Sequence, residues 1–159
     1  MVDPMDALVK LQEAVNARWV VLRPGDIYPY LGVWMDEPAG KTRLTYARVT
    51  GRKVEAVAMF CHNGHIEGVP CFQTGYAVIE PMRQKRFASD LVSRGIEEMR
   101  NGLGKHGAKR FYVEAVVGLT NTASNKLARH LLSDTPETIT DDFSGQPALR
   151  YVKLVECAR

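Results

Sequence analysis

The chain has 159 residues, of which 45% are hydrophobic and 25% charged, and its formal net charge is +3. This composition is typical of a soluble globular protein, so we expect one domain spanning residues 1–159. No apolar run approaches the roughly 20 residues that cross a bilayer, and the first residues lack the order of a secretory signal, which predicts a cytoplasmic protein. The small positive charge does not by itself imply nucleic acid, although it suits an anionic cofactor.

The three cysteines are an odd number in a chain without a secretory signal, so we expect reduced thiols rather than a disulfide scaffold. The only residues that could together hold a metal are two cysteines and two histidines, Cys61, His62, His65 and Cys71. Their spacing matches no familiar zinc pattern, and Asn63-Gly64 is typical of a hairpin turn. We therefore expect a hairpin here and no metal.

The first elements are a helix and a long loop. Asp3-Pro4 offers a cap followed by proline at the first helical position, and apolar residues at helical spacing predict a helix that runs to about Arg18. Residues 23–41 are dense in proline and glycine and carry three aromatic residues, Tyr28, Tyr30 and Trp34. A loop of this kind is either a binding surface or a lid on the core.

Three strands and a long helix are predicted next. We expect strands over 42–50, 54–61 and 72–80, with turns at 51–53 and 63–64. An apolar stripe at helical period then predicts a helix that begins near Phe87 and stops at Gly102 and Gly104.

The last elements are a strand over 110–117, a helix over 121–132 and a strand over 150–155. This order predicts an α+β fold with helices packed on a sheet. We expect the helices and the strand between them to share one core, made of Phe87, Leu91, Ile96, Met99, Phe111, Val113 and Leu127.

The junction at residues 78–91 carries the strongest chemical signal. A buried strand ends, the basic loop Arg83-Gln84-Lys85-Arg86 follows, and a helix begins at once. The N-terminus of a helix has unpaired N–H groups and a positive dipole end, which bind phosphate. A solvated basic turn is the alternative interpretation, and the local chemistry alone favours that alternative.

The wider pattern resembles the acetyl-CoA motif of the GNAT N-acetyltransferase superfamily, in which a strand is followed by Arg/Gln-x-x-Gly-x-Gly/Ala at the start of a long helix. Arg83 matches the first position of this motif and Ala88 the last, whereas Arg86 stands in place of the first glycine. A second block, Asn121 to Leu127 after the strand 111–114, is similar to the family's next helix, which opens with Asn-x-x-Ala/Ser. Ordinary helix capping explains Asn121 and Ser124 equally well.

The resemblance implies a mixed, mostly antiparallel sheet of about six to seven strands flanked by about four helices. It also implies that acetyl-CoA is the acyl donor, held by Val78, Ile79, Arg83, Gln84, Lys85, Arg86, Phe87, Ala88, Asn121 and Ser124. Glu114 matches the place of the family's catalytic base, and its alternative interpretation is a strand residue paired with lysine or arginine. The family's usual general-acid tyrosine is replaced by Ala128.

The resemblance therefore predicts an acetyl-CoA-dependent N-acetyltransferase that acts on a primary amine, with Tyr28, Tyr30 and Trp34 on the acceptor side. The expected partners are acetyl-CoA and an amine acceptor, with no membrane and no nucleic acid, and a homodimer stays open. Arg86 and Ala128 favour a second hypothesis, a GNAT-fold protein with weak or no catalysis that binds coenzyme A or serves in an assembly. A third hypothesis is a small nucleic-acid-binding domain, which the low net charge disfavours.

Overall fold

A computed structural model describes residues 3–157 of the chain. Within these residues the elements are α1 (Pro4–Asn16), β1 (Arg23–Pro24), β2 (Leu31–Asp36), β3 (Arg43–Thr50), β4 (Lys53–Ile66), β5 (Val69–Val78), α2 (Phe87–Lys105), β6 (Arg110–Gly118), α3 (Thr122–Leu131), β7 (Glu137–Thr140) and β8 (Pro147–Glu156). Two short 3-10 turns, η1 (Pro38–Gly40) and η2 (Glu80–Met82), lie between them.

The eight strands form one sheet in the order β1-β2-β3-β4-β5-β6-β8-β7. Neighbouring strands are antiparallel except β5 and β6, which are parallel and joined by the crossover through α2. The predicted α+β class and the mostly antiparallel sheet are confirmed. The described residues contain eight strands, slightly more than the six to seven predicted, and three α-helices instead of about four.

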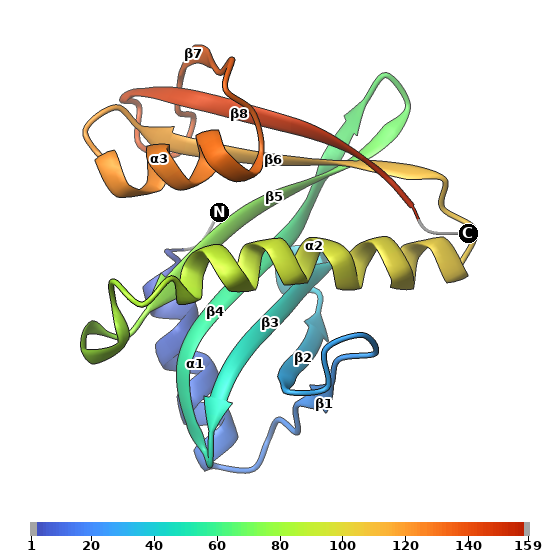
Figure 1. Ribbon diagram of the computed structural model, residues 1–159, viewed down its shortest axis with the longest axis vertical. Coiled ribbons are helices and arrows are strands. Elements are labelled where there is room, and N and C mark those ends of the chain that lie inside the picture. The colour runs from blue at the N-terminus through green and yellow to red at the C-terminus, as the bar shows by residue number, and fades with distance from the viewer. Residues whose placement is uncertain (1–2, 158–159) are drawn as a thin grey trace.

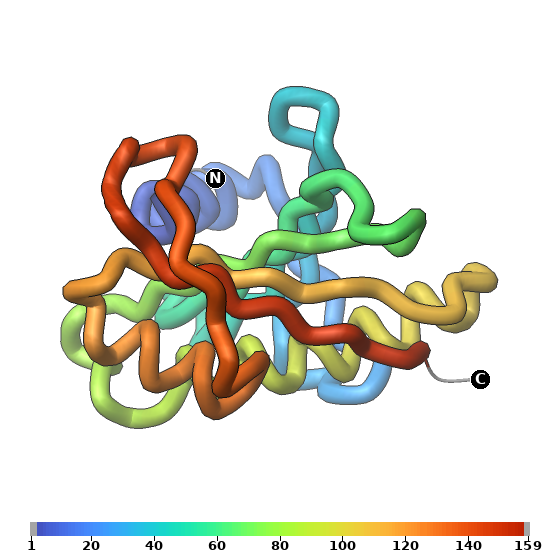
Figure 2. The backbone as a smooth tube through the Cα atoms, turned by 90° about the horizontal axis from the view of Figure 1, so that it is seen from above, coloured from blue at the N-terminus to red at the C-terminus, as the bar shows by residue number. Residues whose placement is uncertain are grey.

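The helices cover the two faces of the sheet unequally. α2 and α3 lie on one face and α1 lies on the other (Figures 1 and 2). The alternation of side chains along β4 explains this arrangement, because Ala56, Ala58 and Phe60 pack toward α2 whereas Val57 packs toward α1. β4 is therefore buried on both faces, and its central residues form a continuous apolar run.

The predicted core is confirmed. All seven residues that we expected in it belong to one cluster between α2, α3 and the sheet, with Phe87 and Leu127 at its partly buried margin. Gly95 lets α2 approach the sheet closely, since a Cβ at this position would lie 2.8 Å from Phe60 Cε2 and 3.0 Å from Tyr46 Cδ2. The close contact positions the middle of α2 against the sheet.

Several predicted boundaries are wrong. The stretch 23–41 is not one long loop, because it contains the strands β1 and β2. The hairpin between β4 and β5 turns at Glu67 and Gly68, which both have positive φ, and Asn63-Gly64 instead forms an irregularity within the pairing. α2 continues through Gly102 and Gly104 and ends at Lys105. β7 was not predicted at all.

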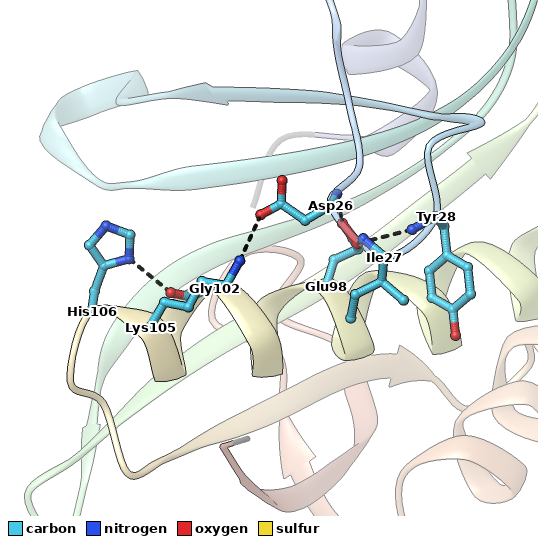
Figure 3. Close-up of polar contacts among 7 residues, drawn as sticks. All are labelled: Asp26, Ile27, Tyr28, Glu98, Gly102, Lys105 and His106. Atoms are coloured by element: carbon cyan, nitrogen blue, oxygen red, sulfur yellow. Dashed lines mark hydrogen bonds and ion pairs between the residues drawn. The ribbon is translucent and has the colours of Figure 1, made fainter. Parts of the chain in front are cut away.

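A buried carboxylate holds the segment before β2 against α2 (Figure 3). Glu98 of α2 is only 7% exposed, and three successive backbone N–H groups at residues 26–28 donate to it at 2.8, 2.5 and 3.2 Å. Gly25 leaves the space for this contact, since a Cβ there would lie 2.8 Å from Glu98 Oε2. The segment that carries Tyr28 is therefore tied to the middle of α2.

No helix among residues 3–157 is long and apolar enough to cross a membrane.

Candidate functional site

The two parallel strands diverge beside the start of α2. β5 and β6 pair only at residues 71–73 with 112–114, so residues 74–78 and 115–118 are not paired with each other. In Figure 1 the two ribbons separate toward the left, where α2 begins beside the end of β5 and α3 lies beside β6. This gap interrupts the hydrogen bonding of an otherwise continuous sheet.

The loop before α2 has the features that we expected of an anion site. Arg83, Lys85 and Arg86 are exposed, and no side chain caps the first turn of α2, so its N–H groups remain available. Arg86 has φ 64 and ψ 18, the left-handed conformation that a glycine adopts most easily, and Gln84 has φ 63. The backbone at residue 86 therefore has a conformation typical of glycine, although an arginine occupies the position.

The start of α3 lies across the gap from β5. Asn121 is the N-cap of α3 and accepts a hydrogen bond from the Ser124 N–H at 3.1 Å, which agrees with the capping interpretation of this residue. The hydroxyl of Tyr76 on β5 donates to Ser124 Oγ at 2.5 Å. This bond bridges β5 and α3 beside the unpaired part of the two strands. Burial raises the pKa of the Tyr76 phenol, and the hydrogen bond to Ser124 opposes that shift.

Sequence reasoning missed Tyr76 as a site residue. The expected strand over 72–80 contained the signal, because alternation from the core residue Phe72 places residue 76 on the helix-covered face. The contact with Ser124, 48 positions away, could not be inferred from that alternation.

A buried polar atom also faces this region. Thr74 is 8% exposed, and its Oγ1 has no hydrogen-bond partner among the described residues. It follows the last residue of β5 that pairs with β6, and it lies on the same face of β5 as Tyr76. Buried hydroxyl groups are normally bonded, so this unpartnered one is unusual at the point where β5 and β6 part.

Glu114 is the last residue of β6 that pairs with β5, and it lies on the face opposite to α2 and α3. It is 4% exposed. Asn63 Nδ2 donates to one carboxylate oxygen at 2.6 Å and Arg150 Nε donates to the other at 2.7 Å. The ion pair matches the alternative interpretation of Glu114, a strand residue paired with arginine. Both oxygens are oriented by fixed donors.

Ala128 cannot supply a proton. It is 2% exposed and packs in a cluster with Ala115, Val117 and Tyr151. Tyr151 is itself completely buried, and its hydroxyl donates to Asn125 Oδ1 at 2.7 Å. This helix position therefore serves the packing of α3 on the sheet.

Of the three aromatic residues predicted for the acceptor side, Tyr28 and Tyr30 pack edge to face with ring centroids 6.2 Å apart, and Trp34 lies apart from them. Tyr28 and Tyr30 lie near α2, with the Arg94 guanidinium 4.7 and 5.3 Å from their ring centres. Trp34 faces the opposite side of the sheet, where it lines a cavity of about 310 Å³ beneath α1. Strand alternation separates them, since the neighbouring Val33 packs into the core on the α2 side.

The four residues that were considered as metal ligands lie on β4 and β5, in the half of the hairpin nearest its turn. The His62 and His65 rings pack edge to face with centroids 5.4 Å apart, and no group of three or more possible metal ligands occurs within residues 3–157. Burial and the nearby Glu114 carboxylate raise the pKa of the Cys71 thiol to about 11. The thiol is therefore protonated at neutral pH and is a poor nucleophile.

No protein-family model and no curated protein matches the chain, but solved structures do. A GNAT-family acetyltransferase from Streptococcus pneumoniae matches with TM-score 0.52 and 11% identity, over 71% of this chain and 66% of that one. RimJ from Mycobacterium smegmatis, in complex with a CoA-disulfide, matches with TM-score 0.55 and 14% identity, over 74% and 55% of the two chains. RimL, an alpha-N-protein acetyltransferase in complex with coenzyme A, matches with TM-score 0.54 and 16% identity, over 73% and 64%.

The protein therefore has the fold of the GNAT acetyltransferases. The chain spans between 55% and 66% of the length of these three proteins. At such low identity the likeness extends to the fold and not to the substrate.

Proposed function

We propose that this protein is an acetyl-CoA-dependent N-acetyltransferase that acts on a primary amine. The observation that carries the proposal is the gap between β5 and β6, which opens beside an uncapped helix N-terminus flanked by three cationic side chains. A ligand with a pyrophosphate and a long polar arm suits this arrangement, because the helix start attracts the phosphates and the gap accepts the arm. Two of the structural neighbours are complexes with coenzyme A species.

Residues around the gap would bind different parts of acetyl-CoA. The loop Arg83–Ala88 would bind the pyrophosphate, with Val78 and Ile79 at the end of β5 beside the arm. Asn121 caps α3, so its contribution would be to hold Ser124 in place. Thr74 Oγ1 would bond to the arm where the strands part.

The proton donor and the proton acceptor would flank the gap from opposite faces. The amine nitrogen attacks the thioester carbonyl carbon, the C–S bond breaks, and an amide and a thiol form. Glu114, on the face opposite to α2 and α3, would take the proton that the amine loses. Tyr76, on the face that α2 and α3 cover, would give its proton to the departing sulfur and recover one from solvent. Burial keeps this phenol protonated at neutral pH, because it raises the pKa.

A second candidate is a GNAT-fold protein that binds coenzyme A with little or no catalysis. The buried Ala128 and the ion pair between Glu114 and Arg150 favour it. Both candidates bind the same ligand, so binding and turnover have to be measured separately.

Acetyl-CoA is expected to raise the melting temperature, since a ligand that binds only the folded state adds about 2.7 kcal/mol at a hundred times its Kd. Lys85→Glu is expected to weaken binding by about tenfold or more, because it places a negative charge beside the phosphates. Calorimetry gives the affinity and differential scanning fluorimetry the stabilisation.

The matched control is Lys105→Glu, which changes the net charge equally at the other end of the same helix. Its affinity should stay within about twofold, since Lys105 makes only an exposed ion pair at 3.9 Å. Absence of heat and of a thermal shift at saturating acetyl-CoA would refute the binding proposal. Equal losses in both variants would place the ligand elsewhere.

Tyr76→Phe is expected to lower turnover by about tenfold or more while acetyl-CoA affinity changes little, because the phenol donates the proton to the thiolate. Ser124→Ala is the control, since it breaks the same hydrogen bond but keeps the phenol. The free thiol released from a panel of amines serves as the readout. If both variants lose the same activity, the bond between the two side chains matters and Tyr76 is not the acid.

A further inference from the structure

A second cavity opens at the edge of the sheet, away from the basic loop before α2. It has a volume of about 540 Å³ and lies between the end of α1, the segment 18–24, the start of β2 and the turn between β3 and β4. No residue of the loop 83–88 lines it. The volume falls in the range of small-molecule sites, which is roughly 300–1,000 Å³.

The floor of this cavity is apolar. Leu31 is 1% exposed, and Leu22 and Val49 are half-buried beside it. Leu22 packs directly on β2, since a Cβ at Gly32 would lie 2.9 Å from Leu22 Cδ1. A ligand that enters the cavity would therefore meet hydrocarbon surface below it.

Three arginines line the same cavity, and none of its fourteen lining residues is acidic. Arg18 follows α1, Arg23 lies on β1, and Arg52 lies in the turn between β3 and β4. Among residues 3–157, no ion pair and no side-chain hydrogen bond involves any of the three guanidinium groups. The chain has 18 acidic residues, yet the charged residues around this apolar floor are all positive. A negatively charged ligand would fit this arrangement.

The turn that carries Arg52 is fixed in place by α1. Gln12 Nε2 donates to the Arg52 carbonyl oxygen at 2.7 Å, and the Val54 N–H donates to Gln12 Oε1 at 2.7 Å. The wall that carries this arginine is thus tied to the helix that leads to Arg18. The three arginines thus line the cavity from separate elements, two of which are joined by hydrogen bonds.

We propose that this cavity binds a small carboxylic acid with an apolar body, of the class of a medium-chain fatty acid. The guanidinium groups would bind the carboxylate through paired N–H donors, and the chain would lie on Leu22, Leu31 and Val49. Cationic or neutral amphiphiles lack the negative charge that the three arginines would bind. This site is independent of the acetyl-CoA site, so either proposal can fail without the other.

The test uses three probes of equal chain length, octanoate, octan-1-ol and octylammonium, titrated into the full chain by calorimetry and by heteronuclear NMR. Octanoate is expected to bind about tenfold more tightly than octanol, with shifts concentrated at residues 18–24, 30–32 and 49–52. Octylammonium is expected not to bind there. Equal affinity for octanoate and octanol, or no binding of octanoate up to about 10 mM, would overturn the proposal.

The double variant Arg23→Gln and Arg52→Gln should weaken octanoate binding by about tenfold or more, and the pair Arg23→Lys and Arg52→Lys by less, because lysine keeps the charge without the paired donors. Arg110→Gln is the control, since Arg110 is exposed on β6 and lines neither cavity. The Lys85→Glu protein should bind octanoate normally. Displacement of octanoate by acetyl-CoA would instead put the carboxylate at the basic loop and refute the site.

Discussion

Truncation of Glu98 to alanine is expected to lower the free energy of unfolding by about 2–4 kcal/mol, because the change leaves three backbone N–H groups of a part-buried segment without their acceptor. Each such group costs about 1–3 kcal/mol when water cannot replace the lost partner. Ile27 is 43% exposed, so water can reach part of the segment and the sum stays below the full penalty. Urea denaturation followed by circular dichroism measures the change.

Glu97→Ala is the matched control, because it removes the same side chain one position earlier on the same helix. Glu97 pairs only with Arg100 at 3.5 Å, and both side chains are more than 40% exposed, so the loss should stay below about 0.5 kcal/mol. Glu98→Gln should fall between the two, since a carboxamide has one acceptor oxygen where the carboxylate has two. Similar losses for residues 97 and 98 would mean that the carboxylate does not hold the segment.

Replacement of Glu114 by glutamine is expected to lower turnover by about a hundredfold or more, while acetyl-CoA affinity stays within a few-fold. Glutamine keeps the shape and removes the group that would accept the proton of the amine. Free coenzyme A released from a panel of amine acceptors gives a common measure. An unchanged rate in the variant would exclude Glu114 as the base.

The ion pair with Arg150 affects this experiment, since loss of one partner of this part-buried pair also destabilises the protein. Assays therefore have to run well below the melting temperature of the variant. Glu137→Gln serves as the control, because Glu137 is the exposed outer partner of the same arginine at 3.2 Å. Its turnover should stay within about twofold of the parent rate. A parent protein that binds acetyl-CoA and acetylates none of a broad panel of amines would favour the non-catalytic candidate.

Local patterns predicted the elements that lie at the centre of the fold. The apolar stripe from Phe87 to Met99 defines α2 because a helix must bury one face against the sheet, and the alternation in 110–117 defines β6 for the same reason. The short edge strands carry no such pattern. β1 has only two residues and β7 four, and neither contains a buried residue, so nothing in their sequences separates them from loops.

The turn at 67–68 shows the same limit. Asn63-Gly64 is the stronger local turn signal, yet the strands continue past it because the pairing of β4 with β5 extends to Ile66 and Val69. The position of the turn was therefore decided by the pairing between the two strands and not by the turn preference of neighbouring residues. A single sequence contains the turn preference but not the partner strand.

The candidate site divides in the same way. The basic loop at 83–86 and the helix that begins after it could be predicted from the sequence, since both depend on neighbouring residues. Three other features became visible only in the folded chain: Tyr76 meets Ser124, Asn63 and Arg150 hold Glu114, and three arginines line one cavity. These contacts join residues up to 51 positions apart, and their geometry depends on how the strands pair and on where β5 and β6 diverge.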